Sequence, residues 1–397
     1  MGSMPRLMHL ADVHLGARYR DLGPAAAAQR ERQFAAFQRA IDLALAEKVD
    51  LVVVCGDLFD SNAQPRRSVE AVAAQFARLA RQHIPTVIIP GTHDCYDEGS
   101  IYRVFDLPAL AGVEPGSDAV VVLTDERSSV SYPALDLTVH GRVFRTKRAP
   151  TSPLAGFSVA GQAGQAAPAE RARWNVGLIH GSLRMPGKVD TDDVLFTEAE
   201  VAASGLDYLA LGHWHSYLSG RAGKTTWAYA GAPEPVALDQ DRAGSVLLVE
   251  LAERAAPRLD VRTVGRTVVK RLDIDAAEIG TQDTLVGRLT ALADENLFLD
   301  VRLVGIMPDE LDLNLDEVER QVNGRFLRFR LRDHSMVALP VGELAPRDTI
   351  PGAFVRDLEA RIAEHESNGD IDGAAELREA LHLGRLLIDE PARVNLV

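Results

Sequence analysis

Aspartate and histidine side chains follow several apolar segments of this sequence, each at the point where the segment ends. Carboxylate and imidazole groups together form sites that Mn, Fe and Zn ions bind well. A single such pair is common, because Gly-Asp and Asp-x-His segments also form turns and helix caps, but a series of them in chain order favours a metal centre. The residues concerned are Asp12, His14, Asp57, His93, Asp94, His180, His213 and His215, and Thr92 directly precedes His93 in the same series.

The segment Gly212-His213-Trp214-His215 is the most specific of these patterns. Side chains alternate between faces in extended backbone, so its two imidazoles lie on the same side, which suits two adjacent ions. Two ions about 3.5–4 Å apart can share an Asp ligand, lower the pKa of a water that bridges them, and offset charge on a phosphoryl group during its transfer. The pattern therefore predicts hydrolysis of a phosphoester.

Strand and helix patterns alternate in the part of the chain that must position these residues. Residues 6–10, 51–55 and 86–89 are short apolar runs typical of buried strands. Between them, residues 29–48 and 67–83 repeat apolar side chains at spacings of three and four, which indicates helices. Strands joined by helices pair in parallel, and sites form beyond the carboxyl ends of such strands. We therefore expect an α/β fold whose predicted ligands meet at one edge.

The rest of the chain is expected to complete one large unit and to add two smaller ones. Strand patterns recur between residues 119 and 251, interrupted at 156–170 by a Gly-, Ala- and Gln-rich segment that is typical of a mobile surface loop. The large unit would span residues 1–265, a small α/β unit residues 266–340, and a linker with a helical hairpin residues 341–397.

The composition is that of an ordinary globular protein, with 397 residues, 46% hydrophobic and 25% charged. A net charge of −14 argues at first against a nucleic-acid binder, but carboxylates that hold metal ions count in that sum. Arg328, Arg330 and Arg332 share one face of a predicted strand and would either contact a phosphate backbone or form a solvated strand face. Two cysteines suit a reducing compartment, so a cytoplasmic location is expected. No apolar run approaches the roughly 20 residues of a membrane span.

Four segments of the sequence resemble the calcineurin-like metallophosphoesterases, and in detail their SbcD-type DNA double-strand-break repair exonuclease branch. They are His9–Gly16, Gly56–Asp60, Pro90–Asp94 and Ala210–His215. The resemblance implies a metallophosphoesterase β-sandwich flanked by helices, with a small α/β capping domain and a C-terminal helical hairpin.

The resemblance also implies a role for each residue of the pattern. Asp12, His14 and His215 would hold one divalent ion, His180 and His213 would hold the other, and Asp57 would bridge both. His93 would donate a proton to the leaving oxygen or stabilise charge, oriented by Asp94. The ions are expected to be Mn, with Fe, Zn, Mg and Co as alternatives.

Thr92 departs from the family pattern, which usually has Asn before the catalytic His. Asn offers a carbonyl oxygen as a ligand, whereas Thr offers a shorter and weaker hydroxyl. We therefore expect a loosely held second ion whose coordination is completed by water. The alternative is that activity is reduced or lost.

The function predicted on this basis is a Mn-type, two-metal-ion phosphodiesterase that hydrolyses DNA, as an exonuclease with or without endonuclease activity, in repair or defence. The capping unit and its Arg row would contact DNA, and the resemblance implies that the tail binds an SMC-like ABC ATPase. The chain has no Walker motif, so ATP use would come from that partner. Helices at 29–48 and 67–83 would pair two copies in a homodimer.

Two other functions fit the same residues. One is a phosphodiesterase or phosphatase for a small nucleotide or a phosphoprotein, although such an enzyme needs neither a capping unit nor a tail. The other is a weakly active scaffold for an ATPase partner, with a site impaired by Thr92.

Overall fold

The structure is a computed structural model of the 397-residue chain. It describes residues 4–149, 151–160, 172–187, 189, 191–253, 255–308, 311–337, 346, 348–368 and 370–389. Most of the predicted surface loop at 156–170, and the predicted linker at 341–345, lie outside these ranges.

The first sheet contains the three apolar strands expected from the sequence. Its order is β14-β13-β1-β2-β3-β4, with β1, β2, β3 and β4 parallel to one another and β13 antiparallel to both β1 and β14. The strands are β1 Arg6–Leu10, β2 Leu51–Cys55, β3 Thr86–Ile89, β4 Val120–Val122, β13 Ser245–Glu250 and β14 Arg258–Thr263.

A second sheet packs against the first. Its order is β11-β12-β10-β7-β6-β5, and β6, β7, β10 and β12 run parallel. The strands are β5 Ser129–Tyr132, β6 Leu137–Gly141, β7 Trp174–His180, β10 Tyr208–Gly212, β11 Leu218–Ala222 and β12 Thr225–Tyr229. A separate two-stranded ladder pairs β8 Ser182–Leu183 with β9 Leu195–Phe196.

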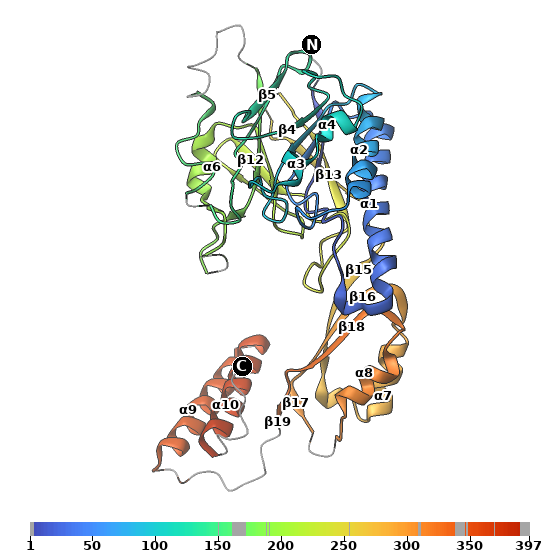
Figure 1. The fold of residues 1–397 in the computed structure, drawn as a ribbon. Coiled ribbons are helices and arrows are strands. Elements are labelled where there is room, and N and C mark those ends of the chain that lie inside the picture. The colour runs from blue at the N-terminus through green and yellow to red at the C-terminus, as the bar shows by residue number, and fades with distance from the viewer. Residues whose placement is uncertain are drawn as a thin grey trace. The chain divides into compact units, whose positions relative to one another are not determined.

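Helices cover the first sheet on the side away from the second (Figure 1). The helices of this unit are α1 Ala26–Glu47, α2 Arg66–Ala80, α3 Ile101–Val104, α4 Leu107–Leu110 and α6 Glu198–Ser204. The long α1 and α2 confirm the helices predicted from residue spacing, with slightly different ends. Alternation within the strands then divides the core: Met8 and Val52 pack against Phe37 of α1, while Leu7 and Val53 face the second sheet.

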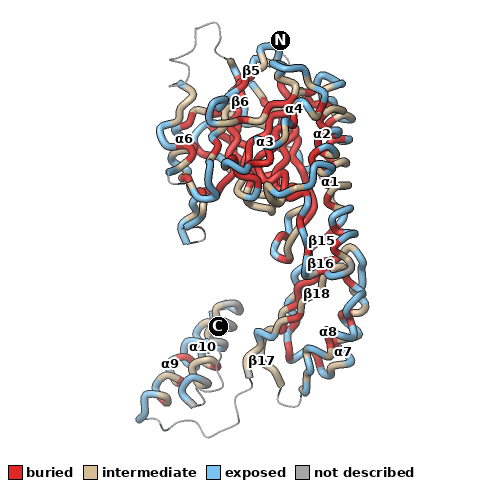
Figure 2. Tube along the Cα trace, in the orientation of Figure 1, coloured by how far each residue is buried: buried red, intermediate tan, exposed pale blue. Residues whose placement is uncertain are grey.

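Figure 2 shows the result, with buried backbone concentrated where the two sheets meet and exposed residues around the outside. This two-layered arrangement of sheets flanked by helices confirms the predicted α/β sandwich. The first compact unit comprises Met1–Lys270 with Asn296–Phe298, and the second comprises Arg271–Glu295 with Leu299–Val397. The division at 340/341 stays a prediction, because residues 338–345 are not described.

The second unit contains a three-stranded sheet of order β15-β16-β18. Its elements are β15 Val268–Asp275, α7 Gln282–Thr290, β16 Asp294–Val304, β17 Ile306–Met307, α8 Leu315–Val322, β18 Phe326–Asp333 and β19 Met336–Val337. Leu299, Val301 and Leu303 alternate with Asp300 and Arg302 along β16. The leucine and valine side chains are fully buried, as are Leu285 of α7 and Val318 of α8, which indicates that the helices cover this face of the sheet.

A helical hairpin follows, made of α9 Ile350–Ser367 and α10 Ile371–Asp389. The two helices lie side by side (Figure 1) and pack closely, since a Cβ added to Gly384 would come within 2.2 Å of the Phe354 ring. The apolar stripe predicted for the first helix is present, with Leu358 and Ile362 buried. Within the described ranges, no helix is long and apolar enough to cross a membrane.

Candidate metal centre

The carboxyl ends of β1, β2, β7 and β10 bring the predicted ligands together. Nε2 of His14 lies 3.1 Å from Nε2 of His215. Nε2 of His180 lies 3.1 Å from Oδ2 of Asp57, and the same Asp57 oxygen lies 3.8 Å from Nε2 of His14. Asp12 approaches both sides of the centre, since its Oδ1 is 3.9 Å from Nδ1 of His180 and 4.0 Å from Nε2 of His215.

These contacts form two groups of side chains, each compact enough to hold an ion. Asp12, His14 and His215 form one, and Asp12, Asp57 and His180 form the other, with the ligand atoms of each group within 4.8 Å of one another. Asp57 contacts imidazoles of both groups, as a bridging ligand must. The ligand assignment remains a prediction, and the predicted ligand His213 belongs to neither group.

Three of the imidazoles are held so that Nε2 faces the centre. Nδ1 of His180 donates to the Cys55 carbonyl at 2.9 Å. Nδ1 of His14 lies 3.4 Å from Oδ1 of Asp60, and Nδ1 of His215 contacts the side-chain amide of Gln240. Partners of this kind fix the orientation of imidazoles that bind metals in other proteins.

Two buried polar atoms at the centre support a bound cation. Among the described residues, Oδ2 of Asp12 and Nε2 of His180 have no hydrogen-bond partner. Leaving such atoms unsatisfied costs free energy in a folded protein, and both are lone-pair donors at the positions where an ion would bind. The residues present therefore fit divalent ions, and the donor set of imidazole and carboxylate suits the transition series.

The backbone of the predicted ligands is strained. Asp12, His14, Asp57 and His213 have φ angles of 52°, 50°, 50° and 102°. Positive φ is uncommon for residues with a side chain and costs of the order of 1–3 kcal/mol where the surroundings impose it. Four such residues lie at one edge of the sheet, so the fold holds these predicted ligands in place at a cost in conformational free energy.

Glycines let the strands approach closely enough for these contacts. A Cβ added to Gly212 would lie 1.8 Å from the Cys55 carbonyl oxygen, and one added to Gly91 would lie 2.2 Å from Oδ1 of Asp57. Gly56 combines φ of 80° with a Cβ position only 2.3 Å from Nδ1 of His180. The space beside the imidazoles and carboxylates therefore depends on residues without side chains.

Burial and the charges of neighbouring groups raise the pKa values of some side chains of the centre and lower the pKa values of others. Burial opposes the charged form of His180, but the negative charge of Asp57 outweighs it and raises the pKa to about 10. His14 behaves alike, because Asp60 and Asp57 outweigh burial and raise its pKa. Burial raises the pKa of Asp12 to about 6. Burial, with the nearby charge of His14, lowers the pKa of His215 to about 3.

The loop after β3 carries His93 beside the centre. The His93 ring lies edge-on to the His14 ring with centroids 4.6 Å apart, and nearly half of the side chain is exposed. Its backbone N–H donates to Oδ1 of Asp57 at 2.7 Å. The hydroxyl of Thr92 lies 3.4 Å from Oδ2 of the same carboxylate. A substrate phosphate could therefore contact His93 from the solvent side.

The structure corrects the expected relation between His93 and Asp94. Nδ1 of His93 donates to the carbonyl oxygen of Asp60 at 3.0 Å. The buried carboxylate of Asp94 instead accepts hydrogen bonds from the backbone of Gly91 and from the Tyr102 hydroxyl, at 2.7 and 2.6 Å. It also accepts from two backbone N–H groups of the loop after β2. Asp94 thus ties two loops together, and Asp60 orients His93.

Asp60, Gln240 and Asp192 are functional neighbours that the sequence analysis did not identify. Asp60 lies in the Gly56–Asp60 segment quoted above, so its place in the motif was a usable signal. Asp192 lies 3.2 Å from Nε2 of His213. Neither Asp192 nor Gln240 falls at the end of an apolar run, so strand-end patterns could not find them.

The predicted Arg row is confirmed as one face of β18, and Arg330 and Arg332 pair with a carboxylate of the neighbouring strand. Arg330 binds Asp300 of β16 through both its Nε and a terminal nitrogen, at 2.9 and 2.8 Å. Arg332 contacts the same carboxylate at 2.8 Å. One buried carboxylate thus offsets part of the row's charge, because residues on neighbouring strands face each other. Contact with DNA stays a prediction for this face.

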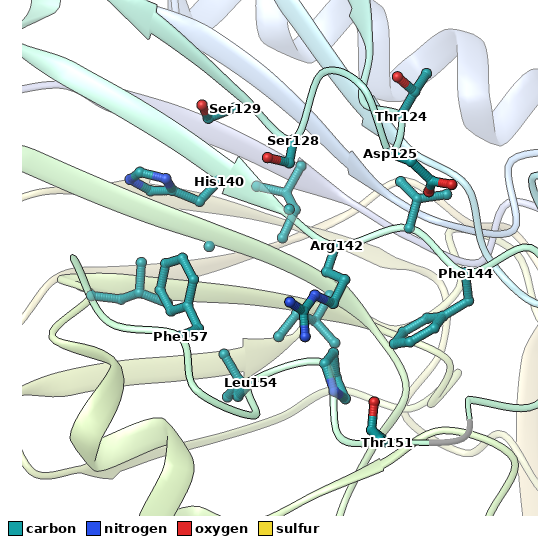
Figure 3. Close-up of a pocket in the computed structure, with 17 residues that line it drawn as sticks. Thr124, Asp125, Ser128, Ser129, His140, Arg142, Phe144, Thr151, Leu154 and Phe157 are labelled. Carbon is teal, nitrogen blue, oxygen red and sulfur yellow. The ribbon is translucent and has the colours of Figure 1, made fainter. Parts of the chain in front are cut away.

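A cavity of about 560 Å³ lies elsewhere in the first unit. Figure 3 shows His140, Arg142, Leu154 and Phe157 around it. Ile179 of β7 lines the cavity, whereas the next residue, His180, belongs to the metal centre. No predicted ligand is among the described residues that line the cavity, so it is separate from the candidate centre.

Comparison with known proteins agrees with this description. A family model for calcineurin-like phosphoesterases matches residues 5–217. The DNA double-strand break repair protein Mre11 of Aeropyrum pernix is 28% identical over 296 residues, 72% of this chain and 67% of that protein. The metallophosphoesterase YhaO of Bacillus subtilis, itself uncharacterised, is 28% identical over 52% of this chain, and the match spans about half (48%) of that relative.

Solved structures include a dimetal phosphatase from Danio rerio, with a TM-score of 0.40 and 13% identity, over 66% of this chain and 97% of that one. The family assignment rests on the model match, which extends over more than half of the chain and contains every predicted ligand at the sheet edge. The chain belongs to the calcineurin-like phosphoesterases and is a metal-dependent phosphoesterase.

Proposed function

We propose that this protein is a two-metal-ion phosphodiesterase that hydrolyses DNA as an exonuclease, with Mn as its preferred ion, in DNA repair. The observation that carries the proposal is the pair of side-chain groups that share Asp12 and are joined by Asp57, beside an exposed His93. Asp12, His14 and His215 would hold one ion, and His180 and His213 the other.

Bound divalent ions would supply Lewis acidity toward the phosphoryl oxygens and lower the pKa of an attacking water. The side chains of this protein would orient the phosphate and protonate the leaving oxygen. Nδ1–H of His93 is committed to the Asp60 carbonyl, which leaves Nε2 to face the phosphate. From there His93 would protonate the leaving oxygen, since general acid catalysis needs a donor within hydrogen-bond reach.

Two observations favour DNA as the substrate. Relatives that bear the name of a DNA double-strand break repair protein match up to 72% of this chain. The second unit also presents Arg328, Arg330 and Arg332 on one face of β18, where the last two pair with Asp300. Contacts of this kind to phosphates add affinity that falls with salt.

We further propose that the hairpin of α9 and α10 binds an SMC-like ABC ATPase subunit, that α1 and α2 pair two copies of the chain, and that the protein works in the cytoplasm. The buried stripe of α9 already packs within the hairpin, so the partner would contact its outer faces. Deleting residues 346–397 should abolish co-purification with the ATPase, and retained binding would exclude this hairpin as the docking element.

The test of activity uses Mn²⁺ with end-labelled duplex DNA and, in parallel, bis-p-nitrophenyl phosphate. Cleavage of both substrates is expected, with release of nucleotides from the labelled ends. Cleavage of the ester alone would favour a small-molecule phosphodiesterase, and cleavage of neither would favour the scaffold.

Variants assign the activity to the centre. His93→Gln should lower the rate of DNA cleavage by about 10²–10⁴-fold, the usual contribution of a general acid. It should slow hydrolysis of bis-p-nitrophenyl phosphate less, because p-nitrophenolate leaves without a proton. His140→Gln is the matched control, because His140 lines the separate cavity and contacts Asn175. Equal rates of DNA cleavage by His93→Gln and by the wild-type protein would show that another residue protonates the leaving group.

A further inference from the structure

The cavity of about 560 Å³ in the first unit has an apolar floor. Leu154, Ile179 and Leu206 line it, are buried, and belong to one hydrophobic cluster, against which the Phe157 ring packs. None of these four residues belongs to the cluster between the two sheets, so the cavity lies on the outer face of the second sheet. Pockets that bind small molecules in other proteins have volumes of about 300–1,000 Å³ and a mainly apolar lining. The volume and the floor of this cavity therefore suit a small molecule.

Polar side chains line the side of the cavity that β5 and β6 form. Ser129 of β5 lies directly opposite His140 of β6 in the antiparallel pair, and both residues line the cavity. Arg142, two residues beyond His140 along the chain, lines it as well. The His140 ring lies edge-on to the Phe157 ring with centroids 5.6 Å apart, so two aromatic rings adjoin this polar side. Nε2 of His140 lies 3.1 Å from Oδ1 of Asn175, and burial lowers the pKa of His140, so the ring is mainly neutral at pH 7.

Arg142 supplies the positive charge of the cavity. Among the described residues that line it, the other charged group is Asp125, and that carboxylate pairs with Arg145. No ion pair or hydrogen bond joins the Arg142 side chain to another residue in the described part of the chain. Figure 3 shows this side chain extending between the rings of Phe144 and Phe157. A guanidinium group binds a phosphate or carboxylate through two parallel N–H donors. An anion carried on an aromatic group would therefore match both the charge and the rings.

We propose that this cavity binds a nucleoside monophosphate, with the base on the apolar floor beside Phe157 and the phosphate at Arg142. The hydroxyls of Ser128 and Ser129, which also line the cavity, are further donors for the phosphate. The choice of a nucleotide among aromatic anions rests on the proposed function, because an exonuclease releases nucleoside monophosphates. The cavity would then be a product-binding site that is separate from the metal centre.

The experiment titrates deoxyadenosine monophosphate into the full chain and follows binding by isothermal titration calorimetry. A chelator is present, so that no divalent ion holds the phosphate at the metal centre. We expect saturable binding of one nucleotide per chain. Deoxyadenosine and inorganic phosphate should each bind at least about tenfold more weakly, because each lacks one part of the contacts. Benzoate represents a different aromatic anion, and tighter binding of benzoate than of the nucleotide would overturn the choice of ligand.

Two variants locate the bound nucleotide. Arg142→Gln should weaken binding by about tenfold or more, because it removes charged hydrogen bonds to the phosphate. Ser129→Trp should abolish binding, because an aromatic side chain is well tolerated in a strand and would fill the cavity.

Arg221→Gln is the matched control. Arg221 lies on β11 of the same sheet, its Nε donates to the Gly223 carbonyl, and neither residue lines the cavity. This variant should bind the nucleotide as the wild-type protein does. The proposal would be overturned if the wild-type protein bound no nucleotide, bound it only with Mn²⁺ present, or bound it no better than Arg142→Gln. A protein that binds the nucleotide but does not cleave DNA would instead refute the proposed function and leave the binding site in place.

Discussion

Metal binding by the metal-free protein is expected to release protons at pH 7. Ligand imidazoles must be neutral to bind an ion, yet the carboxylates of the centre raise the pKa of His180 to about 10 and raise that of His14 as well. His180 is therefore protonated before the metal arrives, and His14 is protonated to a greater extent than a free imidazole. Burial lowers the pKa of His213 and brings that of His215 to about 3, so these two contribute no proton. The structure thus predicts a release of one proton from His180 and of up to one more from His14.

The magnitude follows from the distance between each pKa and the pH. A pKa of about 10 for His180 means that its deprotonation at pH 7 opposes metal binding by about 4 kcal/mol. Affinity should therefore rise with pH. Near pH 6.5 the logarithm of the binding constant should increase by between one and two for each pH unit. Below pH 6 protonation of Asp12, whose pKa is about 6, should steepen the loss of affinity.

The assay is titration of Mn²⁺ into chelator-treated protein in two buffers that differ in ionisation enthalpy, which gives the number of protons released. His140→Gln serves as the control, because His140 lines the separate cavity and burial lowers its pKa. Deprotonation of a bound water would add to the count and cannot reduce it. A release of less than one proton, or an affinity that is constant from pH 6 to 8, would refute this account of the centre.

Three further substitutions test the scaffold. Gly212→Ala should lower the free energy of unfolding by about 1–3 kcal/mol and weaken metal binding, because its Cβ would lie 1.8 Å from the Cys55 carbonyl. Tyr102→Phe should cost about 1.5–3 kcal/mol, because it removes the hydroxyl that donates to the buried Asp94 carboxylate. Asp300→Asn should cost about 1–3 kcal/mol, since it discharges the carboxylate that pairs with two arginines, whose side chains are partly exposed. Denaturant unfolding measures each value.

Matched substitutions control for the type of change. Gly287→Ala lies where an added Cβ meets nothing within 4 Å, so it should not destabilise the chain. Asp312→Asn removes an exposed carboxylate and should change the unfolding free energy by less than about 0.5 kcal/mol. If Gly212→Ala or Asp300→Asn were as mild as these controls, the close strand approach or the buried ion pair would not contribute as argued.

Much of the fold could be predicted because the local patterns agree with the tertiary structure. The runs at 6–10, 51–55 and 86–89 are apolar on both faces, and they lie between a layer of helices and a second sheet, where both faces are buried. The ligand positions followed from the same reasoning, because parallel strands end at a common edge.

Contacts that depend on register between distant strands could not be predicted. No local pattern singles out Asp300, but β16 lies beside β18 in the sheet and its carboxylate pairs there with Arg330 and Arg332. Asp94 follows His93 in sequence, yet the turn at Gly91 directs its carboxylate toward buried backbone N–H groups and leaves Asp60 to orient the imidazole. The conformation of the loop determines which neighbour each side chain contacts. Periodic patterns in the sequence do not predict that conformation.

The strain and the charge of the centre have a common explanation if the centre binds divalent ions. Asp12 and Asp57 are held with positive φ and buried almost without exposure, a combination that costs free energy twice, through the backbone and through desolvation. In the metal-free chain, protons on His14 and His180 offset that negative charge, but they leave Oδ2 of Asp12 without a hydrogen bond. Divalent ions would replace those protons with greater charge and would use that oxygen as well. The edge of the sheet is therefore organised for cations, at the expense of the stability of the chain without them.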